Sequence, residues 1–99
     1  MAFRVELMAR AERELDIISA QSGSEWFREF EDAILSLEEM PTRCAVSARL
    51  STAKRAIRQH LCGWGHDVYW VYFSVDGEFV KVLHLRHTAR KPLKRLYAE

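Results

Sequence analysis

The chain has 99 residues, of which 48% are hydrophobic and 29% charged, and its formal net charge is +1. This composition excludes a disordered chain, and the length allows one domain with one modest core. No apolar run approaches the roughly 18 residues of a membrane span, the first ten residues lack the apolar segment of a secretory signal, and two cysteines are too few for a disulfide framework. We therefore expect a single cytoplasmic domain over residues 1–99.

The N-terminal part of the sequence predicts a strand followed by a helix. Phe3, Val5 and Leu7 alternate with charged residues, which is typical of a short strand with one buried face. From about Ala9 the apolar residues recur at helical spacing, and this helix should stop near Gly23.

A second helix should follow, and the two would form an antiparallel hairpin. Ser22 or Ser24 is expected to cap it, with Glu25 completing a capping box after Ser22, and Pro41 should end it. Its apolar side consists of residues spaced by three or four positions, namely Phe27, Phe30, Ile34 and Leu37.

The C-terminal half predicts three consecutive strands. Residues 42–54 show no clean period and are interpreted as a connecting loop, whereas residues 57–62 alternate as a strand does before a turn at 63–65. Residues 67–75 are almost wholly β-branched or aromatic, which is typical of a central strand, and Asp76-Gly77 predicts a tight hairpin.

The last strand should run from Phe79 to Leu85. Strict alternation would place Leu83 on one face together with Phe79 and Leu85, and His84 on the other face together with Val80 and Val82. His84 is interpreted as an exposed residue of the sheet without a chemical role. Pro92 then prevents further pairing in a central strand.

This order of elements predicts an α+β fold of the type β-α-α-β-β-β. The helix hairpin should pack on one face of a small, twisted and mainly antiparallel sheet, since no other element can cover it. The opposite face would stay partly open, and we expect any functional surface there.

Charge is distributed unevenly along the chain. Residues 1–42 hold four Arg and ten Asp or Glu, a balance of −6, whereas residues 43–99 hold eleven Lys or Arg and four acids, a balance of +7. The acidic half is explained equally well by the solvated outer faces of helices. The basic half suggests a face for an anionic partner.

The candidate site residues are the cations near the ends of the predicted strands. Arginine binds phosphate through two donors at once, and His87 between Arg86 and Arg90 is expected to stay neutral near pH 7 and to act as a base. The competing interpretation is that these cations only interact with solvent. The predicted binding residues are Lys54, Arg55, Arg58, Trp64, Arg86, His87, Arg90 and Lys91.

Other chemistry finds little support in the sequence. Cys62 with His60 and His66 does not have the spacing of a structural zinc site, so we expect no metal and no cofactor. Most aromatic residues of the central strand should belong to the core, which leaves Trp64, at the tip of a turn, as the candidate for exposed contacts.

Several segments in this order resemble the RelE/ParE superfamily of bacterial type II toxins. They are the opening FRVEL followed by ARAERELDII, the LEEMP that closes the second helix, and AIRQHLCGWGHDVYWVYFSVDGEFVKVLHLRHTARKP. In the last of these, VLHLRHTAR stands in place of the usual Val-Leu-x-Val-x-His-x-x-Arg. The resemblance covers nearly the whole chain.

The resemblance implies a compact αβ fold and an antitoxin partner whose C-terminal segment wraps around the toxin. Relatives of the ParE type poison DNA gyrase and act in plasmid stabilisation, whereas relatives of the RelE type cut mRNA on the ribosome. By position, Arg58 matches the strand arginine of the superfamily, and His87 and Arg90 match its closing motif. Tyr97 matches the C-terminal tyrosine of the RNases less well, because it lies further from the strand.

These features favour a gyrase-directed growth inhibitor, which would not be an enzyme. The alternative is a ribosome-dependent mRNA endonuclease with Arg58, His87 and Arg90 as its catalytic residues. A third interpretation is a non-toxic binding module that retains the fold. A homodimer is compatible with all three.

Overall fold

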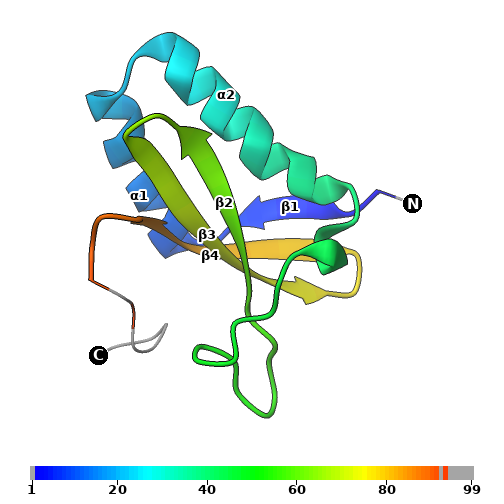
Figure 1. The fold of residues 1–99 in the computed structure, drawn as a ribbon. Helices are drawn as coiled ribbons and strands as arrows, with labels where there is room; N and C mark the ends of the chain where they lie inside the picture. The colour runs from blue at the N-terminus through cyan, green and yellow to red at the C-terminus, as the bar shows by residue number, and fades with distance from the viewer. Residues whose placement is uncertain (1, 92, 94–99) are drawn as a thin grey trace.

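The elements of the fold follow the predicted order. The computed structural model describes residues 2–91 and 93 (Figure 1). Its strands and helices are β1 (Arg4–Leu7), α1 (Ala9–Gln21), α2 (Ser24–Leu35), β2 (Arg58–Trp64), β3 (Asp67–Asp76) and β4 (Phe79–His87). Two short 3-10 helices, Ser36–Glu38 and Pro41–Arg43, follow α2. The predicted α+β arrangement is confirmed.

The four strands form one mixed sheet in the order β1-β4-β3-β2. The β2–β3 and β3–β4 pairs are antiparallel, as expected for consecutive hairpins, and β1 pairs in parallel with β4 through Val5 opposite Val80. Both helices lie on one side of this sheet (Figure 1). Neither is long and apolar enough to cross a membrane, and no other helix of the described residues is.

The main core lies between the helices and the sheet. The apolar stripes of α1 and α2 meet alternate residues of β3 and β4, where Phe73 is fully buried. The side chains of β1 lie at the margin of the same core. Its buried residues are Ala11, Ile18, Phe30, Ile34, Leu37, Cys62, Val71, Phe73, Val80, Val82 and Leu85.

A β-bulge in β4 changes which residues face the helices. The register of β3 against β4 shifts after Tyr72, and Leu83 is the additional residue. One extra residue reverses the alternation of a strand. Leu85 therefore shares the helix side with Val82, whereas Leu83 and His84 face the other side. The predictions that Leu83 shares a face with Leu85, and His84 a face with Val82, were wrong.

The ends of the helices also differ from the prediction. The Ser22 hydroxyl donates to the Ile18 carbonyl at 2.6 Å, so it satisfies the last turn of α1 and does not cap α2. Gly23 precedes α2 without a side-chain cap, and the predicted capping box does not form. Helix α2 ends at Leu35, well before Pro41, and continues as a 3-10 turn.

The segment between α2 and β2 is more than a connection. It crosses the sheet face opposite the helices and places Leu50 and Ile57 in a second core, where they are 7% and 2% exposed. The Ser51 hydroxyl donates to the Ser47 carbonyl at 2.6 Å and accepts from the Ile57 amide at 2.8 Å, which fixes the path of the segment. The buried residues of this second core are Leu50, Ile57, Tyr72 and Leu83.

Beyond the last residue of β4 that pairs with β1, Glu14 of α1 binds the edge of β4. Its carboxylate accepts from the Leu85 amide at 2.9 Å and lies 2.8 Å from His84 Nδ1. Burial raises the pKa of Glu14, but the hydrogen bonds from His84 and Leu85 and the nearby positive charges outweigh burial, so its pKa lies below the ordinary value. His84 is 0% exposed, so the expectation of an exposed histidine was wrong.

Candidate anion-binding groove

A groove of about 450 Å³ lies on the sheet face opposite the helices. We call it the basic groove. Its floor consists of Gln59 from β2, Trp70 and Tyr72 from β3, and Arg86 from β4. One wall is formed by residues 46–50, and the other by Thr88, Arg90, Lys91 and Leu93.

The described residues give the basic groove a positive charge. Of the residues that the structure describes, four cations line it, Arg49, Arg86, Arg90 and Lys91, and no Asp or Glu does. A concave surface with one sign of charge concentrates its field and attracts the opposite charge. The groove is therefore suited to an anion.

Arg86 closes one side of the groove. Its Nε and Nη2 both donate to the Lys91 carbonyl, at 3.0 and 2.7 Å, and so hold Lys91 beside β4. Burial, followed by the charge of Arg90, lowers the pKa of Arg86. Arg86 thus shapes the groove as well as contributing charge to it.

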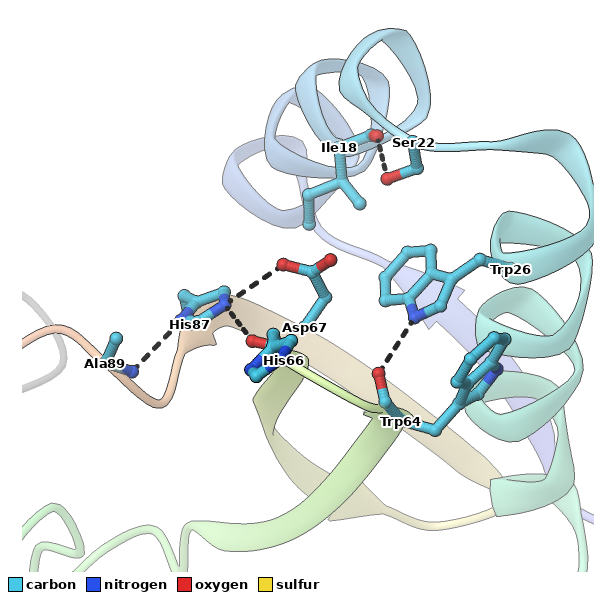
Figure 2. Close-up of polar contacts among 8 residues, drawn as sticks. All are labelled: Ile18, Ser22, Trp26, Trp64, His66, Asp67, His87 and Ala89. Carbon is cyan, nitrogen blue, oxygen red and sulfur yellow. Dashed lines mark hydrogen bonds and ion pairs between the residues drawn. The ribbon is translucent and has the colours of Figure 1, made fainter.

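His87 has both ring nitrogens engaged (Figure 2). Nε2 lies 3.1 Å from the His66 carbonyl and 3.4 Å from Asp67 Oδ1, while Nδ1 accepts from the Ala89 amide at 3.0 Å. This pattern fits the neutral imidazole with its proton on Nε2. The ring also packs edge-on against Tyr69. It organises the turn after β4 and presents no free nitrogen.

Arg58 lies apart from this cluster. It pairs with Phe73 in the sheet, and its side chain is therefore on the side of the helices. Its Nη1 donates to the carbonyls of Thr42 and Cys44 at 2.9 and 2.7 Å. These two bonds hold the 42–44 segment against β2.

A second groove, of about 470 Å³, gathers the remaining predicted cations. Lys54, Arg55 and Arg58 line it together with Lys81, whose amino group is paired with Asp76 at 3.2 Å. The structure thus brings Arg86, His87, Arg90 and Lys91 together and places Lys54, Arg55 and Arg58 elsewhere.

Trp64 belongs to neither groove. It is 53% exposed at the end of β2, where its Nε1 donates to Glu29 of α2 at 2.7 Å. Its carbonyl lies 3.4 Å from Nε1 of Trp26, which also belongs to α2 (Figure 2). Of the other residues considered above, Pro92 and Tyr97 lie outside the described part of the chain.

The sequence interpretation missed Arg49, Gln59 and Trp70. Trp70 lies one position from Tyr69, so alternation along β3 places it on the face away from the helices and could have indicated its exposure. No sequence pattern indicated that Arg49 would line the groove, because its position depends on the path of an aperiodic segment.

Neither cysteine is reactive by its surroundings. Burial, together with the neighbouring Cys44, raises the pKa of Cys62 to about 12, and burial raises the pKa of Cys44 as well. Among residues 2–91 and 93, no three His, Cys, Asp or Glu side chains gather as metal ligands.

No protein-family model matches this chain, and neither a curated protein nor a solved structure matches it. The function is therefore inferred from the residues of the grooves and from the segments quoted above.

Proposed function

We propose that the protein is the toxin of a type II toxin–antitoxin system, acting in the cytoplasm on DNA gyrase. The proposal starts from the resemblance of its sequence segments to RelE/ParE toxins. It is supported by the arrangement of a helix hairpin on one sheet face and a groove with four described cations on the other. We expect the acidic C-terminal segment of an antitoxin to bind in this groove beside Arg86 and His87, with Arg90 as the available donor.

The separation of Arg58 from His87 is the observation that favours gyrase over mRNA. An endonuclease needs a base near the 2′-hydroxyl and cations around the same phosphate. Arg58 instead donates to two loop carbonyls at the start of β2, whereas His87 lies at the end of β4 with both of its ring nitrogens occupied. The three predicted catalytic residues therefore do not form one constellation, which supports a non-enzymatic toxin.

The test is induced expression of the full chain in bacteria without an antitoxin. We expect growth arrest with loss of supercoiling and induction of the DNA-damage response. Cleavage of mRNA at codon-linked positions, abolished by His87→Ala, would replace the gyrase proposal by the endonuclease. Normal growth with soluble protein would remove both and leave a non-toxic binding module.

A matched pair of variants connects growth arrest to the basic groove. Arg90→Ala removes an exposed cation of the groove, and Arg28→Ala removes an exposed cation of α2. If an antitoxin segment binds the groove, Arg90→Ala should weaken neutralisation about tenfold, whereas Arg28→Ala should not. Equal neutralisation of both variants would contradict this placement of the antitoxin.

A further inference from the structure

We propose that the basic groove binds a nucleoside phosphate, with the base against Trp70 and the phosphate between Arg49 and Arg90. This inference goes beyond the proposed function and does not depend on it. Binding is measured on the purified protein, whereas the toxin proposal is tested by growth.

The phosphate position follows from the available donors. Arg49 projects from the wall formed by residues 46–50, and Arg90 from the segment after β4, so the groove lies between them. Both residues are exposed, and neither guanidinium has a hydrogen bond or ion pair with another described residue. Arg86, by contrast, is committed to the Lys91 carbonyl. The guanidinium groups of Arg49 and Arg90 are therefore the ones available to bind an anion.

The base position follows from the floor of the groove. Trp70 is half-buried there and lies near-parallel to Tyr72, with ring centroids 6.5 Å apart and planes inclined by 29°. Bases stack on such aromatic faces. Gln59 lines the same floor, and its amide supplies both a donor and an acceptor for the edge of a base.

Size and composition fit a nucleotide as a second ligand of the groove, one that would compete there with the antitoxin segment. The groove of about 450 Å³ falls within the range typical of small-ligand sites. An acidic peptide would use the four cations but would leave the aromatic floor and Gln59 without a role. A nucleoside phosphate uses the cations, the aromatic floor and the amide together.

The experiment titrates the full chain with AMP, GMP, CMP and UMP by calorimetry at fixed salt. Tripolyphosphate serves as the phosphate without a base, uridine as the base without a phosphate, and a hexaglutamate peptide as the acidic competitor. A single-stranded oligonucleotide is added to distinguish a free nucleotide from a nucleic acid as the source of the same unit.

Variants assign the two halves of the site. Arg49→Ala and Arg90→Ala should each weaken nucleotide binding about tenfold or more, and Arg28→Ala on α2 should not. Trp70→Leu should weaken nucleotide binding at least about fivefold and leave tripolyphosphate binding unchanged, and Trp70→Phe should retain most of the affinity. The phenylalanine variant separates stacking from a general loss of folding.

Nucleotide binding with this pattern supports the proposal, and tighter binding of the oligonucleotide by the same residues would name nucleic acid as the source. Equal binding of tripolyphosphate and nucleotides, with no effect of Trp70→Leu, would overturn it. So would binding of hexaglutamate alone, or of no anion at all by folded protein.

Discussion

One face of the sheet is covered by two helices, and the other by a segment without regular structure. The helix side buries eleven residues in a continuous core, whereas the opposite side buries four. The helix side is closed, and the groove forms beside the smaller core because a short segment cannot cover a whole sheet face. The difference leaves a concave, basic surface on one face of the sheet.

Truncation of the main core should have the largest effect. Phe73→Ala removes a fully buried ring from the centre of the helix side and should cost about 3 to 5 kcal/mol of unfolding free energy. Chemical denaturation followed by circular dichroism measures this cost. A loss below about 1 kcal/mol would contradict the central position of Phe73 in the core.

Truncation of the second core should cost less and should also act on the groove. Ile57→Ala should reduce the unfolding free energy by about 2 to 3 kcal/mol, since Ile57 is buried but in a smaller cluster. It should also loosen residues 46–50, which form one wall of the basic groove. Relative to the wild type, Ile57→Ala should increase the hydrogen-exchange rate of residues 46–50 more than that of α2. An equal increase in both segments would mean that Ile57 does not anchor the wall.

Regular elements could be predicted from the sequence because each has its own period. The helices and strands follow apolar spacings that depend only on neighbours along the chain. The second core escaped prediction because Leu50 and Ile57 gain their partners from the path of a loop. The bulge at Leu83 carries no glycine to mark it, and burial of His84 depends on Glu14, which is distant in sequence.

The site could be predicted in part for the same reason. Arg86, Arg90 and Lys91 are neighbours in sequence and remain neighbours in the groove. Arg58 pairs with Phe73 and His87 with Tyr69, so both lie on the helix side but at different positions along β3, and the sequence does not state this register. The separation of Arg58 from His87 therefore required the structure.

Glu14 lies at the edge of the sheet between its two faces, and its substitution should have an intermediate effect on the unfolding free energy. Glu14→Gln replaces a carboxylate that accepts from Leu85 and binds His84, and should cost about 1 to 2 kcal/mol at neutral pH. Because the pKa of Glu14 is lowered in the folded state, its contribution is present above its ordinary pKa of 4.5 and is lost as pH falls through the folded value.

The stability difference between wild type and Glu14→Gln should therefore shrink as the pH is lowered below about 4.5. Denaturation at several pH values tests this dependence. Glu12→Gln, an exposed residue of the same helix, is the control and should show little difference at any pH. A Glu14→Gln difference that stays constant with pH would mean that the carboxylate charge contributes nothing to stability.

The smallest stability effect should come from the groove itself. Arg49→Ala changes an exposed side chain without a hydrogen bond or ion pair to another described residue, so the unfolding free energy should change by less than about 0.5 kcal/mol. Binding of anions should nevertheless weaken about tenfold. A residue that contributes to binding but not to stability is what the comparison of the two faces predicts for the groove. A loss of stability as large as that of Ile57→Ala would instead make Arg49 part of the second core.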